Sequence, residues 1–352
     1  MKILHLLNHC EFANGHVHVA VDLACGQVRH GDSVVVASSG GHYEALLDEN
    51  GVEHRRLEQR KRDPASIARA AREVCRLARE FRPDLIHAHM MTGAVLGRVA
   101  ATVTGSRLVT HVHNSFDRHS DWMRLGDRII SVSTAVGDQL KARGFPASKI
   151  RVVVNGPLES PRLSNMPAAE SPDWPRPAIA TLCGMHDRKG VRDLLAAFEL
   201  LAADITGVHL YLLGDGPQRN QYEALAAAGR VASRIHFVGS VSDPRPMLGA
   251  IDVFVLASHA DPCPLVIPEA RAAGCAIIAT RVDGIPEALD GGQAGILVPP
   301  SDPVRLAEAL KSLLTDEARL TEAKRSALCN LDRFTTTALC ARVDAVYKEL
   351  AA

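Results

Sequence analysis

The sequence predicts an α/β protein with two doubly wound domains, each built on a parallel β-sheet that helices cover on both faces. Short apolar segments alternate with amphipathic segments of helical periodicity along most of the chain. The apolar segments are largely uninterrupted by polar residues, which is typical of strands buried on both faces of a parallel sheet. The length of 352 residues is more than one domain commonly contains.

The first half of the chain opens in the order strand, helix, strand. An apolar run at 3–7 precedes a polar turn, a helical pattern follows, Gly31 ends it, and a β-branched run covers 33–37. The alternation continues with helices at 64–81, 92–102 and 135–143 and strands at 84–88, 107–112, 128–132 and 150–154. We therefore expect a first Rossmann-like domain over residues 1–158.

The segment 159–177 differs from the rest because it is rich in proline, which neither helices nor strand ladders tolerate at that density. It is predicted to be the interdomain linker. The alternation then resumes, with strands expected at 178–182, 208–213, 235–238, 253–257 and 276–280, and helices at 191–203, 218–228, 265–273, 304–315 and 316–330. These define a second domain over 178–334, and 335–352 is expected to form a closing helix that packs back on the first domain.

Composition excludes several classes of protein. The 40 basic and 40 acidic side chains balance, which argues against nucleic acid as the main partner. The eight cysteines include no C-x-x-C pair, so neither a structural zinc site nor a thioredoxin-type motif is expected. No segment has the features of a secretory signal or of a membrane span. We expect a cytoplasmic protein, which could also bind peripherally to the inner face of the membrane.

The strongest candidate site lies between Phe254 and Pro300. Asp261 is predicted in a loop after a strand, Glu269 follows near the start of a helix, and a Gly284-Ile-Pro-Glu287 turn comes later. The two oxygens of a glutamate suit two vicinal hydroxyl groups of a ligand. The alternative for Glu269 is a carboxylate of the first helical turn that only stabilises the helix dipole.

A basic turn precedes the first helix of the second domain. Arg188 and Lys189 follow a strand, where fixed positive charge and helix-terminal amides favour phosphate. The backbone amides of Leu265 and Val266 near the next helix start could serve the same purpose. The alternative is a solvated basic turn. Gly214-x-Gly216 is poor evidence for a dinucleotide because position 219 is arginine, not glycine.

This order of motifs resembles the retaining glycosyltransferases of family four (glycosyl transferases group 1). Their GT-B fold has two Rossmann-like domains that face a deep cleft. The matching segments are Asp84–His89, Ile130–Ser133, Val152–Gly156, Arg188–Gly190, Leu213–Pro217 and Gly284–Glu287. The resemblance implies transfer of a sugar from a nucleotide diphosphate sugar to a hydroxyl acceptor, in surface polysaccharide, lipopolysaccharide or glycolipid assembly. The chain has no D-x-D motif, so no metal and no other cofactor is expected.

The resemblance also implies residue roles. The expected catalytic residues are His113, Asp261 and Lys189. The expected donor-binding residues are Arg188, Lys189, Gly214, Gly239, Val241, Asp261, Pro264, Leu265, Val266 and Glu269. Asn14 and Gly15 are expected in a loop for the acceptor or the diphosphate. Two positions depart from the family pattern: Asp261 replaces a glutamate, and Met185 follows Gly184 where arginine is common.

Other interpretations remain open at this point. The pairs His16-x-His18, His87-x-His89 and His111-x-His113 could bind zinc in a hydrolase, with Asp117 and Asp121 as the nearest carboxylates. A nucleotide-sugar epimerase or hydrolase, or a non-catalytic nucleotide-sugar-binding protein, could share the fold. The arginine-rich stretch 55–82 could dock on an anionic membrane surface or could be a solvated helix face.

Overall fold

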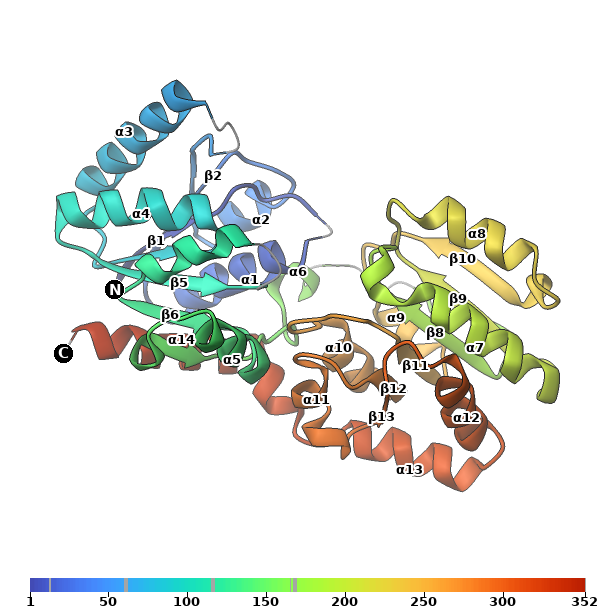
Figure 1. Ribbon diagram of the computed structural model, residues 1–352. Coiled ribbons are helices and arrows are strands. Elements are labelled where there is room, and N and C mark those ends of the chain that lie inside the picture. The colour runs from blue at the N-terminus through green and yellow to red at the C-terminus, as the bar shows by residue number, and fades with distance from the viewer. Residues whose placement is uncertain (13, 60–62, 115–117, 165, 167–169, 352) are drawn as a thin grey trace. The chain divides into compact units, whose positions relative to one another are not determined.

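The computed structural model describes residues 1–12, 14–59, 63–114, 118–164, 166 and 170–351. The chain divides into two compact units, the first of residues 1–165 and 332–352 and the second of residues 166–331. Figure 1 shows a β-sheet with helices on both faces in each unit, and both chain ends in the first unit. The last helix therefore belongs to the same unit as the first strand.

The sheet of the first unit has the strand order β3-β2-β1-β4-β5-β6-β7, and all its neighbours pair in parallel. The strands are β1 (Lys2–Leu6), β2 (Ser33–Ser38), β3 (Glu53–Arg56), β4 (Leu85–Ala88), β5 (Arg107–Val112), β6 (Arg128–Ser131) and β7 (Ile150–Val152). The helices are α1 (Gly15–Arg29), α2 (Glu44–Glu49), α3 (Pro64–Phe81), α4 (Met91–Thr104), α5 (Thr134–Ala142), α6 (Pro161–Ser164) and α14 (Thr336–Ala351).

The sheet of the second unit has the order β10-β9-β8-β11-β12-β13, again with parallel neighbours throughout. The strands are β8 (Ala178–Leu182), β9 (His209–Leu213), β10 (Ile235–Gly239), β11 (Val253–Leu256), β12 (Ala276–Thr280) and β13 (Ile296–Val298). The helices are α7 (Val191–Asp204), α8 (Arg219–Ala227), α9 (Arg245–Gly249), α10 (Val266–Ala272), α11 (Ile285–Ala288), α12 (Pro303–Leu314) and α13 (Glu317–Ala327).

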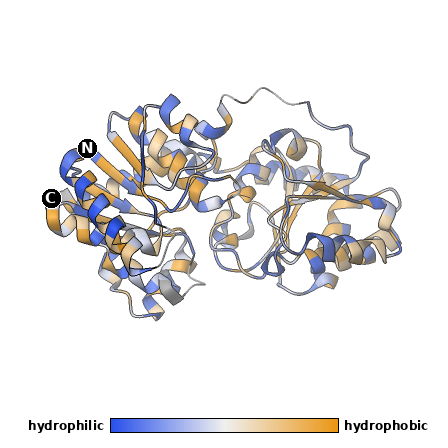
Figure 2. Ribbon diagram, turned by 90° about the horizontal axis from the view of Figure 1, so that it is seen from above, coloured by the Kyte–Doolittle hydropathy of each residue, from blue (hydrophilic) through white to orange (hydrophobic). Residues whose placement is uncertain are grey.

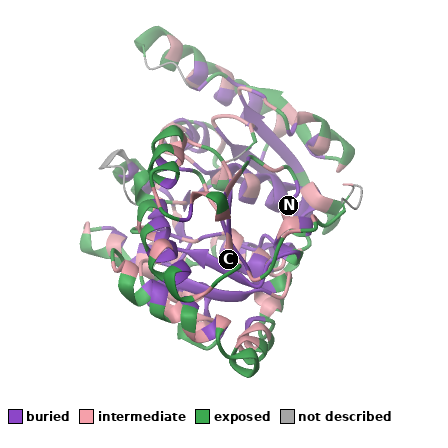
Figure 3. Cartoon of the chain, turned by 90° about the vertical axis from the view of Figure 1, so that its right-hand side faces the viewer, coloured by how far each residue is buried: buried purple, intermediate pink, exposed green. Residues whose placement is uncertain are grey.

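The strands form the core of each unit. Figure 2 shows that they are mainly hydrophobic, and Figure 3 shows them buried beneath helices whose outer faces are exposed. The central strands β4 and β11 are buried along their whole length. These observations confirm the α/β fold class with two Rossmann-like parallel sheets.

The helix α14 packs against α1 in the first unit. Gly26 of α1 makes this approach possible, because a Cβ at this position would lie 2.4 Å from the sulfur of Cys340. Arg342 of α14 donates to the carbonyl oxygen of Val154 at 2.9 Å, close to the end of β7. The closing helix thus contributes side chains to the first unit.

Several elements differ from the sequence-based expectation. The charged strand β3 was not expected, because its sequence EHRR lacks apolar character; it forms the sheet edge by backbone pairing with β2. The expectation that the proline-rich segment holds no helix was wrong, since Pro161–Ser164 forms the single turn α6. Proline is compatible with the first turn of a helix because the amide it lacks has no helical partner there.

Candidate functional site

The strand orders place the predicted residues at the switch points of the two sheets. In each sheet the order reverses direction, between β1 and β4 in the first and between β8 and β11 in the second. Ligands of such sheets bind beyond the carboxyl ends of the strands at this point. Asn14 follows β1, Lys189 follows β8 and Asp261 follows β11, so each unit carries predicted site residues at its own switch point.

Lys189 and Asp261 form an ion pair across the switch point of the second sheet. The Nζ atom of Lys189 lies 2.5 Å from Oδ2 of Asp261, and both side chains are largely buried. The hydroxyl of Ser258 donates to the same carboxylate oxygen at 3.4 Å. The backbone amide of Asp261 donates to the carboxylate of Asp283 at 2.8 Å. A cation and an anion that are 72 positions apart in the sequence are therefore held together at the carboxyl ends of the central strands.

The turn that carries Arg188 and Lys189 is fixed to the end of β11. It is a 3₁₀ turn at Asp187–Lys189, followed by Gly190 with φ of 63°. A Cβ at Gly190 would lie 1.9 Å from the carbonyl oxygen of Ala257, so only glycine permits this close approach. The amide of His259 donates to the carbonyl oxygen of Arg188 at 2.7 Å. The basic turn is thus positioned by backbone contacts, and the exposed Arg188 side chain donates from Nη1 to the carbonyl oxygen of Ala260 at 3.5 Å.

Two predicted glycines link the neighbouring strand ends. The amide of Gly214 donates to the carbonyl oxygen of Gly239 at 2.7 Å, and both residues have positive φ. A Cβ at Gly214 would lie 2.1 Å from the carbonyl oxygen of Cys183. Val241 lies half-buried two positions after Gly239. The carboxyl ends of β8, β9 and β10 are therefore closely packed against one another.

Met185 is a core residue at these strand ends. Its side chain is 1% exposed and belongs to the apolar core of the second unit. Its amide donates to the carbonyl oxygen of Asp215, and its own carbonyl oxygen accepts from the amide of Gln218. Positive charge at these strand ends comes instead from Arg188 and Lys189, three and four positions later.

The remaining predicted donor residues lie around the start of α10. Pro264 is buried, and Leu265 is the residue before the first helical position, Val266. Glu269 is half-buried in the first turn. Asp261 and Glu269 thus lie on the same connection after β11, as expected. Ser258, His259 and Asp283, which hold Asp261 and the basic turn in place, were not predicted from the sequence.

In the first unit, Asn14 and Gly15 form the start of α1. The carbonyl oxygen of Asn14 accepts from the amides of Val17 and His18, and Gly15 is exposed. The first turn of α1 contains no acidic residue. The partial positive charge of the helix N-terminus is therefore not offset locally, which suits a polar or anionic ligand group.

His113 belongs to a group of neighbouring imidazole rings, some stacked and some tilted, at the carboxyl ends of the strands of the first sheet. Consecutive ring centroids lie 4.2–5.9 Å apart, as measured for His5, His9, His16, His87, His89, His111 and His113. Burial lowers the pKa of His5 to about 4 and that of His111 to about 3. It also holds the pKa values of His87, His89 and His113 well below the usual range. The rings of His5, His87, His89, His111 and His113 are therefore neutral at pH 7.

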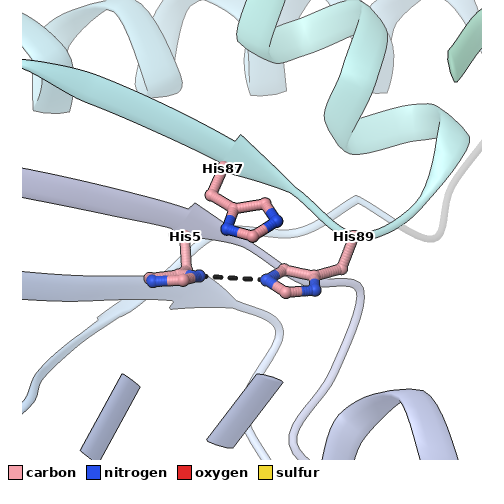
Figure 4. A group of neighbouring side chains, drawn as sticks. All are labelled: His5, His87 and His89. Carbon is pink, nitrogen blue, oxygen red and sulfur yellow. Dashed lines mark hydrogen bonds between the residues drawn. The ribbon is translucent and has the colours of Figure 1, made fainter. Parts of the chain in front are cut away.

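Two sets of three histidines place their ring nitrogens close enough to be considered for a metal, namely His5, His87 and His89, and His89, His111 and His113. Figure 4 shows the first set, in which Nδ1 of His5 lies 2.9 Å from Nε2 of His89. The other nitrogen of His5 lies 2.7 Å from the amide oxygen of Gln27, and that of His89 lies 3.1 Å from Nε2 of His113.

These hydrogen bonds engage both nitrogens of His5, which belongs to the first set, and both nitrogens of His89, which belongs to both sets. Neither ring retains a lone pair for a metal unless a hydrogen bond breaks. Of the carboxylates considered with them, Asp121 pairs with Arg143 at 2.5 Å, and Asp117 lies outside the described residues. The geometry therefore favours a hydrogen-bonded histidine network over the zinc-hydrolase interpretation.

The basic stretch 55–82 falls on β3 and α3. Arg69, Arg72, Arg76 and Arg79 are exposed along α3, and Arg76 pairs with Glu80 at 3.0 Å. On this helix the side chain of Ile67 is 44% exposed, whereas that of Val74 is buried. Residues 60–62 of the stretch lie outside the described residues. Among the described helices, none combines the length and apolar character that a membrane span requires.

Models of known protein families match both halves of the chain. A family model for Glycosyltransferase Family 4 matches residues 13–156, and one for glycosyl transferases group 1 matches residues 176–316. Glycogen synthase of Mycobacterium tuberculosis is 30% identical over 270 residues, which are 71% of this chain and 64% of that protein. The lipopolysaccharide core biosynthesis glycosyltransferase LpsE of Rhizobium meliloti is 34% identical over 142 residues, 40% of this chain and 41% of LpsE. The matches thus cover less than two thirds of either relative.

Solved structures share the fold over almost the full chain. HepE of Anabaena, solved in complex with UDP, has a TM-score of 0.82 at 20% identity and covers 99% of this chain and 100% of its own. A glycosyltransferase from Rickettsia africae has a TM-score of 0.82 at 20% identity, covering 99% of this chain and 98% of its own. At this level of identity, the likeness shows the fold alone.

Proposed function

The chain belongs to the GT-B-fold glycosyltransferases of family four, and we propose that it is a retaining, metal-independent enzyme that transfers a sugar from a nucleotide diphosphate sugar to a hydroxyl acceptor. The observation that carries this proposal is the Lys189–Asp261 pair at the switch point of the second sheet. A lysine there suits a diphosphate, and an aspartate beside it suits the hydroxyl groups of a sugar.

The second unit binds the donor in this proposal. Arg188 and Lys189 attract the diphosphate, and the amides of Leu265 and Val266 near the start of α10 add backbone donors beside the buried Pro264. Glu269 accepts the two ribose hydroxyl hydrogens, while Gly239 and Val241 line the position of the base and Gly214 keeps the strand ends close. HepE was solved with UDP, which supports a nucleoside diphosphate as the ligand of this fold.

Positive charge from side chains replaces a divalent cation in this proposal. The absence of a D-x-D motif supports this, since transferases that hold the diphosphate through a metal usually carry one. Lys189 is available to the diphosphate once the phosphate oxygens compete with Asp261 for its ammonium group, because a charge-assisted bond can exchange one anion for another. Asp261 is then left to accept a hydroxyl hydrogen of the donor sugar.

The first unit binds the acceptor near Asn14 and Gly15, and His113 contacts a sugar hydroxyl. Because burial holds the pKa of His113 well below its usual range, the neutral ring orients a hydroxyl and is a poor base at pH 7. The departing phosphate oxygen therefore takes the acceptor's proton. The bond between the sugar carbon and the phosphate oxygen breaks, and the bond to the acceptor oxygen forms on the same face.

Two substitutions test this assignment. Lys189→Ala and Glu269→Ala should each lower turnover at least tenfold, which corresponds to about 1.4 kcal/mol of transition-state stabilisation. Lys311→Ala is the matched control, because Lys311 also pairs with an aspartate, Asp204, at 2.6 Å but on the exposed surface of the same unit. The control should retain full turnover. Unchanged turnover in both Lys189→Ala and Glu269→Ala would defeat the proposal.

The same assay separates the alternative activities. A transferase releases the nucleoside diphosphate in proportion to the acceptor supplied. A hydrolase or an epimerase converts the donor without an acceptor, and a non-catalytic binding protein binds it without converting it. Acceptor-independent conversion, or binding without conversion across a panel of donors and acceptors, would therefore replace the proposed function by one of these.

We further propose that the exposed arginines of α3 contact an anionic membrane surface, where a lipid-linked acceptor in glycolipid, lipopolysaccharide or surface polysaccharide assembly would be found. Arg69, Arg72 and Arg79 are exposed on this helix together with the apolar side chain of Ile67. Sedimentation with vesicles that contain phosphatidylserine should show binding at low salt that high salt removes. An absence of binding at low salt would refute this contact.

A further inference from the structure

A continuous chain of hydrogen bonds runs through the first unit from the last helix to His113. Nε2 of Gln27, on α1, donates to the hydroxyl oxygen of Tyr347, on α14, at 3.2 Å. The amide oxygen of Gln27 lies 2.7 Å from Nε2 of His5. From there the chain continues from His5 to His89 at 2.9 Å and from His89 to His113 at 3.1 Å. Figure 4 shows the central link between His5 and His89.

In this chain, the donor and acceptor roles of one imidazole fix the donor and acceptor roles of the next. A neutral histidine has one N–H donor and one lone pair, so engaging one nitrogen as donor makes the other an acceptor. The oxygen of Gln27 only accepts, so Nε2 of His5 carries the proton and Nδ1 accepts from Nε2 of His89. By the same rule, Nδ1 of His89 accepts from Nε2 of His113. The proton of His113 is therefore on Nε2, and its Nδ1 has a lone pair.

Burial keeps the chain neutral, so protonation does not interrupt this order. His5 and His89 are almost completely buried, and His113 is half-buried at the end of the chain. Desolvation lowers the pKa of His5 to about 4 and holds those of His89 and His113 well below the usual range. Gln27 is also buried, with 4% exposure, so its amide has few other partners.

We propose that Gln27 is a positioning residue whose amide oxygen sets the tautomer of His113, so that Nδ1 of His113 offers a lone pair to a hydroxyl group of the substrate. The identity of that hydroxyl as one of a sugar rests on the proposed function; the tautomer itself does not. The lone pair on a nitrogen of a neutral imidazole accepts a hydrogen bond from a hydroxyl group. It therefore favours a hydroxyl group over a group that can only accept hydrogen bonds. A reversed Gln27 amide would reverse every bond in the chain and make Nδ1 of His113 a donor.

The tautomer can be measured directly in the substrate-free protein. Long-range ¹H–¹⁵N spectra of the full chain labelled with ¹⁵N-histidine distinguish the two tautomers, and His113 is assigned by the loss of its signals in His113→Phe. In the unsubstituted protein at pH 7, His113 should carry its proton on Nε2 in about tenfold excess or more, because the aligned hydrogen bonds all favour that form. Gln27→Leu should reduce this excess to about threefold or less, since it removes the oxygen that orients the chain.

A matched control is available in the same unit. Gln59 is also a buried glutamine, whose Nε2 donates to the carbonyl oxygens of Leu7 and Ala37, and it is not part of the chain. Gln59→Leu should leave the His113 tautomer unchanged. A predominant Nδ1–H form in the unsubstituted protein, or the same tautomer ratio in Gln27→Leu as in Gln59→Leu, would overturn the proposal.

Activity measured on the same variants separates this proposal from the proposed function. If both hold, Gln27→Leu lowers kcat about threefold to tenfold while KM for the donor changes less than twofold, because the second unit supplies most donor contacts. If the tautomer responds as expected but the unsubstituted protein transfers no sugar, the proposed function fails and the role of Gln27 stands. A changed tautomer with unchanged kcat would show that His113 does not contact the reacting substrate.

Discussion

The buried, neutral histidines His5, His87, His89, His111 and His113, here called the histidine network, predict that the first unit loses stability in mild acid. The folded state keeps these rings unprotonated, whereas in the unfolded chain each has a pKa near 6.5. As the pH falls below 6.5, the unfolded chain binds protons that the folded state does not, and the free energy of unfolding decreases. The stabilisation is complete above pH 6.5 and is lost progressively as the pH falls toward the folded-state values.

The magnitude follows from His111, whose pKa burial lowers to about 3. Between pH 7 and pH 5, this residue alone should remove about 2 kcal/mol from the free energy of unfolding. His111 is the best residue to replace because neither of its ring nitrogens has a hydrogen-bond partner among the described residues. In His111→Phe, an aromatic ring is retained next to His87 and His113. The loss between pH 7 and pH 5 should be smaller by about 2 kcal/mol in this variant.

Urea unfolding at pH 7 and pH 5, with hydrogen exchange measured by mass spectrometry, gives this difference for each unit separately. The second unit is an internal control, because the network lies entirely in the first. His111→Phe can shift stability at both pH values by changing the packing, so the quantity to compare is the change with pH. An equal loss in the variant and the unsubstituted protein would refute the reasoning, as would acid sensitivity confined to the second unit.

Two further substitutions test how the units are built. Arg162→Met should lower the free energy of unfolding by about 3–5 kcal/mol, because it leaves the carboxylate of Asp22 buried without its 2.9 Å partner. In urea unfolding, the double variant Arg162→Met with Asp22→Leu should recover much of that loss. A double variant as unstable as Arg162→Met alone would contradict this. Gly190→Ala should reduce both thermal stability and turnover, because its Cβ would lie 1.9 Å from the carbonyl oxygen of Ala257. Gly207→Ala is the control, since Gly207 also has positive φ (78°) but no atom would lie within 4 Å of its Cβ; similar melting temperatures for the two variants would show that the close contact does not matter.

The central strands could be predicted from the sequence because their burial on both faces leaves a direct trace in composition. Runs such as 253–257 and 276–280 are apolar almost throughout and appear as strands within a residue of the expected bounds. The edge strand β3 could not be predicted in this way. Its side chains are largely exposed, and backbone pairing with β2, rather than side-chain burial, defines it as a strand.

The candidate site shows the same division. Asp261 and Lys189 could be proposed from local motifs and a family resemblance, because each follows a strand that is recognisable in the sequence. Their ion pair, and the contacts of Asp283 and His259 that support it, depend on chain segments far apart in the sequence. The chain from Tyr347 to His113 is less predictable still, since Gln27 and Tyr347 are 320 positions apart.

The anomeric configuration of the product tests the central claim most directly. The protein would be incubated with α-linked nucleotide diphosphate sugars and hydroxyl acceptors in the presence of a metal chelator, and the glycosidic linkage determined by NMR. We expect an α-linked product that forms only with an acceptor and at the same rate with and without the chelator. A β-linked product, or donor cleavage without transfer, would contradict the assignment as a retaining glycosyltransferase.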